Sequence, residues 1–270
     1  MKSLMLHVGH DDGFDGRLEL AVDLARTLDA HLTLVQPCLA QDFVAFDMAG
    51  GAHFIAQAYA AAEKARAELK SWVEADLANE GVVWDWQAID SASTVEILAE
   101  VARFSDLAIV SLDNDRRGAG QPGRSLVGDL AMSSRTPVLA VPPGVAKLSL
   151  GTAMIAYDGG PEASFAIRSA TSLLAACTSV KIASVDADPA DFPQSDAASY
   201  LARHGIKADI LPLAKGGRTI EEVLVVASKD LGADLLVMGA YGHSRWREAL
   251  FGGVTHYVLA ETKIPVLLAH

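Results

Sequence analysis

The sequence predicts an α/β fold made of two doubly wound domains in tandem, each built on a five-stranded parallel sheet. Three observations predict it. Short apolar runs alternate with stretches of helical spacing or propensity, which is typical of strand, helix, strand units. The same order restarts after the breaker Pro142-Pro143-Gly144. Short sequence segments also recur: residues 105–111 resemble 233–239, and residues 137–140 resemble 265–268. We therefore interpret the chain as a diverged tandem duplication.

The first half contains five apolar runs that we expect to be strands. The second of them is expected to end at Pro37, and a capping box at Ser93 and Glu96 opens a helix. Gly81 closes a long helix rich in alanine and glutamate. The expected strands are 4–8, 31–35, 82–86, 107–110 and 137–141, and the expected helices are 18–28, 54–79, 93–103 and 126–133.

The second half repeats this order. A capping box at Thr219 and Glu222 opens a helix that Gly232 closes. The expected strands are 152–157, 180–185, 207–213, 235–238 and 265–269, and the expected helices are 162–176, 196–203, 219–231 and 254–261. We place the domains at residues 1–144 and 151–270, with residues 145–150 as a linker. Connections this short favour parallel strands with right-handed crossovers.

Composition excludes several classes of protein. Of 270 residues, 51% are hydrophobic and 21% charged, so a large core can form, and the net charge of -12 disfavours contact with nucleic acid. Cys38 and Cys177 are far apart, and their spacing indicates neither a disulfide scaffold nor a zinc site. No apolar segment approaches the roughly 20 residues that span a bilayer. We expect a cytoplasmic protein that contacts neither nucleic acid nor membrane.

The strongest functional signal lies between the expected strand 235–238 and the helix that opens at Val254. Gly239, Gly242 and Gly252 stand where strand gives way to loop and loop to helix. Glycine allows the backbone to approach a ligand closely, and a helix N-terminus offers unpaired N–H groups to an anion. Doubly wound sheets bind ligands beyond the carboxyl ends of their strands, where the turn at Asp158 would also lie. The pattern favours a phosphate.

With these residues in hand, the sequence resembles the universal stress protein family, as a tandem two-domain member with Rossmann-like domains. Gly239, Gly242 and Gly252 match the family's ATP loop of glycine, two residues, glycine, nine residues, glycine and a hydroxyl residue, although Gly253 stands at the hydroxyl position. Asp158 matches the family's aspartate against the nucleoside, and Val185 its apolar contact to the base. The resemblance implies ATP bound by Tyr157, Asp158, Gly159, Val185, Met238, Gly239, Gly242, His243, Arg245, Gly252, Gly253, Val254 and Thr255.

The corresponding loop of the N-terminal half departs from this pattern. Ser111 and Asn114 stand where the first two glycines would be, and Asp113 and Asp115 add negative charge beside the phosphate position. We predict that this half is degenerate and has lost ATP binding.

Other chemistry is less well supported. His7, His10, Asp11 and Asp12 offer metal-ligand types, but strand alternation separates neighbouring side chains and no distant third ligand is evident. Adjacent His243 and Ser244 are not arranged as a nucleophile and base. A Walker A sequence is absent.

The function predicted from the sequence is that of a stress-response regulator binding ATP or a related adenine nucleotide in its C-terminal domain, with at most slow, incidental hydrolysis. Two alternatives stay open: a dimerisation and interaction module that binds no nucleotide, which Gly253 favours, and an enzyme related by fold analogy to adenine-nucleotide hydrolases and ligases. The apolar fifth strands, 137–141 and 265–269, would lie at sheet edges and pair, either within the chain as a pseudo-dimer or between chains.

Overall fold

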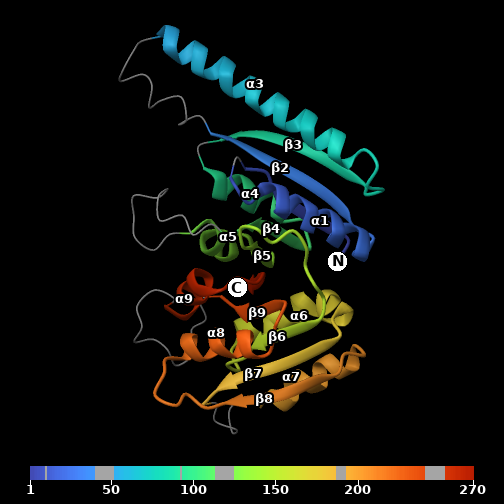
Figure 1. Ribbon diagram of the computed structural model, residues 1–270, viewed down its shortest axis with the longest axis vertical. Helices are drawn as coiled ribbons and strands as arrows, with labels where there is room; N and C mark the ends of the chain where they lie inside the picture. The colour runs from blue at the N-terminus through green and yellow to red at the C-terminus, as the bar shows by residue number, and fades with distance from the viewer. Residues whose placement is uncertain (10, 40–51, 92, 113–124, 187–192, 241–252) are drawn as a thin grey trace.

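The computed structural model describes residues 1–9, 11–39, 52–91, 93–112, 125–186, 193–240 and 253–270 (Figure 1). Both halves show strands and helices in strict alternation. The N-terminal half contains β1 (Ser3–His7), α1 (Phe14–Leu28), β2 (His31–Leu39), α3 (Ala52–Leu77), β3 (Trp84–Ser91), α4 (Thr94–Ala102), β4 (Leu107–Ser111), α5 (Leu126–Ser134) and β5 (Val138–Val141). The C-terminal half contains β6 (Thr152–Ala156), α6 (Pro161–Ala176), β7 (Ser179–Val185), α7 (Gln194–Arg203), β8 (Ala208–Leu213), α8 (Ile220–Asp230), β9 (Leu235–Gly239), α9 (Gly253–Glu261) and β10 (Val266–Ala269).

All ten strands form one sheet in the order β3-β2-β1-β4-β5-β10-β9-β6-β7-β8. Pairing is parallel within each half, as predicted, and antiparallel where β5 meets β10, with Leu139 opposite Leu267. The fifth strands are therefore at the centre of the sheet rather than at its edges, and they pair within the chain. The edges are β3 and β8. The expected edge position is confirmed within each half: β5 and β10 are the outermost strands of their own five-stranded halves, and these two fully buried apolar strands satisfy each other's hydrogen bonds.

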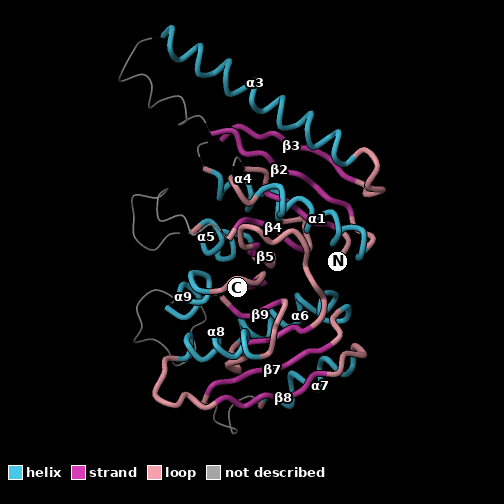
Figure 2. The backbone as a smooth tube through the Cα atoms, in the orientation of Figure 1, coloured by secondary structure: helices cyan, strands magenta, loops and turns pink. Residues whose placement is uncertain are grey.

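Helices cover both faces of this sheet (Figures 1 and 2). Alternate residues of each central strand point to opposite faces, so Leu267 and Leu268 belong to different cores. One core lies under α1, α6, α7 and the C-terminal end of α3, and the other lies under α4, α5, α8 and α9. Each core receives residues from both halves of the chain, which makes the two repeats parts of one packed body.

Pro37 does not end the second strand, contrary to expectation. β1 pairs with β2 only as far as His7 opposite Val35, whereas β3 pairs with β2 from Leu32 to Leu39. Beyond Val35 the strand therefore has a partner on one side. A proline without an N–H is tolerated where one edge of a strand is open.

The expected caps at Ser93, Thr219 and Gly232 are confirmed. The Ser93 and Thr219 side chains each accept the backbone N–H three residues later, at 3.4 Å, and Glu222 completes the capping box at Thr219. Gly232, with a φ of +57°, follows the C-cap of α8 as expected, whereas α3 ends at Leu77, four residues before Gly81, whose φ is +68°.

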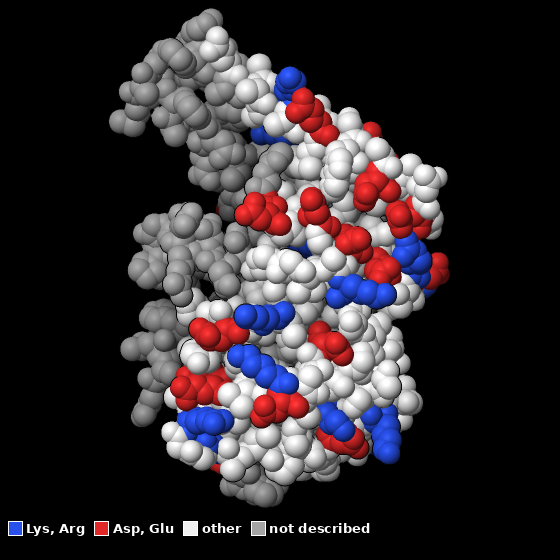
Figure 3. All heavy atoms as spheres, in the orientation of Figure 1, with Lys and Arg blue, Asp and Glu red and all other residues white. Residues whose placement is uncertain are grey.

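The surface carries both signs of charge. Figure 3 shows acidic and basic side chains interspersed over the face in view. Among the described residues, no helix is both long and apolar enough to cross a bilayer.

Candidate ligand site at the switch point of the C-terminal half

The C-terminal half has its switch point between β6 and β9. β6 lies between β7 and β9, so the connections that leave β6 and β9 run in opposite directions across the sheet. Ala156, the last residue of β6, is paired with Met238 of β9. The chain segments that follow, beginning with Asp158 and Gly239, therefore start side by side at the carboxyl edge of the sheet. This is where ligands bind in doubly wound folds.

Asp158 is held in a tight turn between β6 and α6. Its Oδ1 accepts the Gly160 N–H at 2.8 Å, and Gly159 has a φ of +81°. The side chain is exposed. The carboxylate is thus fixed by the backbone while a face remains toward solvent, which suits a group that accepts hydrogen bonds from a ligand.

Tyr157 presents its backbone, and not its aromatic ring, at the carboxyl edge of the sheet. Its carbonyl oxygen accepts the Ser184 hydroxyl at 2.6 Å, and its side chain is 7% exposed within the core beneath α6. Burial raises the pKa of its phenol. Because the Tyr157 phenol is buried and neutral, the negative charge of this turn is that of Asp158.

Gly239 is required by packing as well as by any ligand. A Cβ at this position would lie 2.6 Å from the Ala163 nitrogen and 2.7 Å from the Glu162 carbonyl carbon, inside contact distance. The first turn of α6 therefore rests directly on the end of β9. The glycine has a structural explanation that the sequence pattern alone did not reveal.

The remaining predicted residues fall into three groups. Met238 and Thr255 are each 4% exposed, so their side chains belong to the interior, and Val185 is half-buried at the end of β7. Gly253 and Val254 form the start of α9, as predicted. Gly242, His243, Arg245 and Gly252 lie outside the described residues.

The N-terminal half carries a rearranged version of the same turn. Because Ser3 and Thr152 open equivalent strands, the first part of each repeat matches at a difference of 149 (152 minus 3). Leu4 and Ala153 then align, and they are paired with Leu107 and Leu235 at the start of the equivalent strands β4 and β9. Gly9 then corresponds to Asp158, and Asp11 to Gly160. Asp11 Oδ2 lies 2.8 Å from where a Gly9 Cβ would be, and Asp158 Oδ1 lies 3.0 Å from where a Gly160 Cβ would be. Carboxylate and glycine have exchanged places.

In the N-terminal half this carboxylate already has a partner. Arg17, fully buried on α1, donates from Nη1 and Nη2 to the two Asp11 oxygens at 2.9 and 2.8 Å, and from Nε and Nη2 to the His7 carbonyl. Burial raises the pKa of Asp11, but hydrogen bonding and the charge of Arg17 outweigh it and hold the pKa below its ordinary value. The corresponding residue in the C-terminal half is Ala166, also fully buried.

Sequence reasoning missed Arg17, although a signal was present. Phe14, Arg17, Ala21 and Leu24 recur at spacings of three and four, which places the arginine in the apolar stripe of α1. An arginine in such a stripe requires a buried anion, and Asp11 lies six residues before it.

His7 lies beside this ion pair at the end of β1. Its Nδ1 is buried and has no hydrogen-bond partner among the described residues, and burial followed by the charge of Arg17 lowers its pKa to about 4. Asp11 is a poor candidate for a metal ligand, because Arg17 donates hydrogen bonds to both of its carboxylate oxygens. Within the described residues no group of three or more histidine, cysteine and acidic side chains could hold a metal ion; His10 lies outside them.

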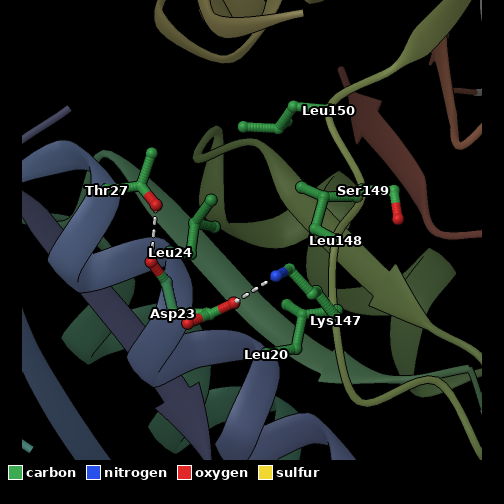
Figure 4. A pocket seen from close by; sticks show the side chains of 8 residues that line it. All are labelled: Leu20, Asp23, Leu24, Thr27, Lys147, Leu148, Ser149 and Leu150. Carbon is green, nitrogen blue, oxygen red and sulfur yellow. Dashed lines mark hydrogen bonds and ion pairs between the residues drawn. The ribbon is translucent and has the colours of Figure 1, made fainter.

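A cavity of about 330 Å³ lies elsewhere, where the linker crosses α1 (Figure 4). Leucines from α1 and the linker line it, and Lys147 Nζ lies 3.7 Å from Asp23 Oδ2 across it. It contains no set of polar groups converging on one point, so we assign it to packing of the linker.

Comparison with known proteins agrees with this geometry. The model of the universal stress protein family matches residues 150–270. The C-terminal half belongs to the universal stress protein family. Universal stress protein Slr1230 of Synechocystis sp. is 51% identical over 47 residues, which are 17% of this chain and 16% of that protein's length. The sequence match therefore spans less than a fifth of this chain and less than a fifth of that protein.

Solved structures extend the fold to both halves. A universal stress protein from Archaeoglobus fulgidus superposes with a TM-score of 0.69 at 15% identity, covering 99% of this chain and 96% of that one. A putative universal stress protein from Pseudomonas aeruginosa gives 0.60 at 16% identity, covering 99% and 93%. At this identity the likeness shows the fold alone: the universal stress protein fold occurs twice in this chain.

Proposed function

We propose that the chain is a cytoplasmic stress-response regulator that binds ATP or a related adenine nucleotide at the switch point of its C-terminal half. One observation carries this proposal. The pairing of Ala156 with Met238 sets the exposed carboxylate of Asp158 beside the backbone of Gly239 at the carboxyl edge of the sheet. The glycine-rich sequence that follows Gly239 leads directly into α9.

Electrostatics orients the nucleotide. A carboxylate repels a triphosphate, whereas ribose hydroxyls and the adenine amino group can donate hydrogen bonds to it, so the nucleoside belongs at Asp158. The phosphates belong at the start of α9, because the first N–H groups of a helix, here those of Gly253 and Val254, can donate to an anion. Gly242, His243, Arg245 and Gly252 are sequence-based candidates for the same phosphates.

The N-terminal half would not bind a second nucleotide in this way. Its carboxylate is Asp11, and Arg17 supplies two hydrogen bonds where a ribose would supply them. A ligand would have to displace a buried guanidinium, leaving its charge unpaired. One nucleotide per chain is the expected stoichiometry.

The output of binding is regulatory in this proposal. Asp158 is the exposed acid of the turn, and its Oδ1 accepts the Gly160 N–H. A hydrolytic enzyme needs a positioned base for the attacking water. Any hydrolysis would be slow.

Isothermal titration with ATP tests the site. Asp158→Asn keeps an oxygen for the Gly160 N–H but removes the charge that accepts from the nucleoside, so we expect affinity to fall about tenfold, near 1.4 kcal/mol. Asp12→Asn is the matched control, because Asp12 is an exposed acid of the equivalent loop after β1. Equal loss in both variants, or none in Asp158→Asn, would refute the assignment of Asp158.

A second candidate is an interaction module without nucleotide. Two observations favour it: Gly253 replaces the hydroxyl expected by resemblance, and Thr255, the nearest hydroxyl in α9, is buried. Denaturing freshly purified protein and analysing the supernatant by anion-exchange chromatography separates the two candidates. Adenine nucleotide near one equivalent supports binding. If the extract is empty and titration with ATP gives no heat, the interaction module is the better description.

A further inference from the structure

We propose a second ligand site, for the phosphate group of a small phosphorylated metabolite, in a cleft between the N-terminal half and α6. The cleft has a volume of about 440 Å³. Arg103 and Arg135, at the C-terminal ends of α4 and α5, line one side, and Ser169 and Ser172 of α6 line the other. It lies at the amino ends of β4 and β5, away from the carboxyl edge that carries the nucleotide proposal.

Internal pseudo-symmetry gives this cleft a natural comparison. At the difference of 149 between the repeats, Ser169 and Ser172 correspond to Leu20 and Asp23. Those two residues line the cavity in Figure 4, together with Lys147 and Leu148 of the linker. Leu148 is 7% exposed there. The linker thus enters one of two related grooves, and the cleft at Ser169 is the one it leaves open.

The open cleft differs from its counterpart in chemistry as well as occupancy. Asp106 and Asp234 are equivalent, since each carboxylate accepts the backbone N–H that opens the neighbouring strand. Counting from them, Arg103 corresponds to Leu231, and the matching turns before Pro137 and Pro265 align Arg135 with Lys263. The fold therefore does not need a cation at position 103, because a leucine serves at the equivalent helix end.

The two guanidinium groups are available. Both arginines are exposed, and within the described parts of the chain neither side chain has an ion pair or hydrogen bond. In a protein of net charge -12, two unpaired arginines on one cleft are a local reversal of sign. Guanidinium forks match the oxygens of a phosphate, and the hydroxyls of Ser105 and Ser169 add neutral donors.

The hydrogen-bond acceptors at the helix ends beside the cleft already have donors. The Ala102 carbonyl, at the end of α4, accepts the Thr136 hydroxyl at 2.6 Å, and the Ser134 hydroxyl bonds the backbone of Thr136. Asp106 also lines the cleft and keeps its negative charge, against two positive charges on Arg103 and Arg135, and its Oδ2 accepts the N–H groups of Lys2 and Ser3. The volume exceeds that of inorganic phosphate and lies within the range of small-molecule sites, which favours a phosphorylated metabolite of sugar size.

Titration calorimetry at low salt tests the proposal with three probes: glucose 6-phosphate, inorganic phosphate and glucose. We expect glucose 6-phosphate to bind and glucose not to bind. Arg103→Leu, which copies Leu231, combined with Arg135→Gln should weaken binding at least tenfold. Lys263→Gln, at the position of the C-terminal half that corresponds to Arg135, is the matched control and should leave binding unchanged. Asp158→Asn should also leave it unchanged, which separates this site from the nucleotide proposal.

The three probes also distinguish a site for a phosphorylated metabolite from a site for free phosphate. Tighter binding of glucose 6-phosphate than of inorganic phosphate supports a metabolite site, and equal binding supports a site for free phosphate. Amide shifts at Ser105 and Ser169 in ¹⁵N spectra should accompany either result. Absence of binding by both phosphates at millimolar concentration, or full affinity in the Arg103→Leu, Arg135→Gln variant, would overturn the proposal.

Discussion

Arg17 binds both carboxylate oxygens of Asp11, at 2.9 and 2.8 Å, beneath the turn that follows β1. The repeat in the C-terminal half has Ala166 in place of the arginine and presents Asp158 to solvent. In the N-terminal half the carboxylate after the first strand is therefore held in an internal ion pair, whereas in the C-terminal half the corresponding carboxylate is exposed to solvent. This asymmetry is the structural basis for assigning the ligand to one half.

Removing the buried guanidinium should destabilise the protein strongly. Arg17→Ala leaves Asp11 without its partner and the His7 carbonyl without its donors, so we expect the free energy of unfolding to fall by about 3 kcal/mol. Urea unfolding followed by circular dichroism measures it. Arg168→Ala removes an exposed arginine of α6 and should cost less than about 0.5 kcal/mol. Similar losses in the two variants would contradict the role given to the ion pair.

His7 should make stability depend on pH. Its pKa is lowered from 6.5 to about 4, so the unfolded chain binds a proton between these values that the folded chain does not. Stability therefore falls as pH drops from 6.5 toward 4 and the effect levels off below that range. The effect at pH 5 should be about 2 kcal/mol relative to pH 7.

His7→Ala isolates this effect, because Ala156 occupies the equivalent position and the other titrating groups, Asp11 included, remain. The variant should lose about 2 kcal/mol less than the parent between pH 7 and pH 5. Parallel pH profiles of the two proteins would show that the imidazole of His7 is not excluded from protonation in the fold.

Gly239→Ala should be a defect of packing. The added Cβ would meet the backbone of Ala163 and Glu162, which are not free to move as a flexible side chain would be. We expect a loss of about 1 to 3 kcal/mol in the free energy of unfolding. Ser111→Ala, at the equivalent strand end, keeps a Cβ that the N-terminal half already accommodates and should cost much less. A neutral Gly239→Ala variant would mean that α6 does not rest on β9.

The alternation of strands and helices, the caps and the duplication could all be predicted from the sequence, because each depends on local periodicity or on capping residues such as Ser93 and Thr219. The position of Pro37 could not, since it depends on where β1 stops beside β2. The sequence also left two pairings open for the fifth strands. Leu139 opposite Leu267 decides between them, and that contact joins residues from different repeats.

The position of the candidate site in the fold could be predicted from the sequence, but the packing around its residues could not. Asp158 and Gly239 come together because parallel strands bring their carboxyl ends to one edge. The packing role of Gly239 depends on how closely α6 approaches, which no local pattern encodes. The exchange of Asp11 and Gly9 hides the equivalence of the two turns, because a carboxylate moved by two residues breaks the motif while keeping the position of the charge.

Photoaffinity labelling with 8-azido-ATP tests the central claim most directly, because it reports where the nucleotide lies as well as whether it binds. Labelled protein would be digested and the modified peptides sequenced by mass spectrometry, with excess ATP as competitor. We predict competed labelling in the C-terminal half, in peptides that contain Asp158, Val185 or Gly239. Labelling confined to residues 1–141, or no labelling that ATP competes away, would contradict the account.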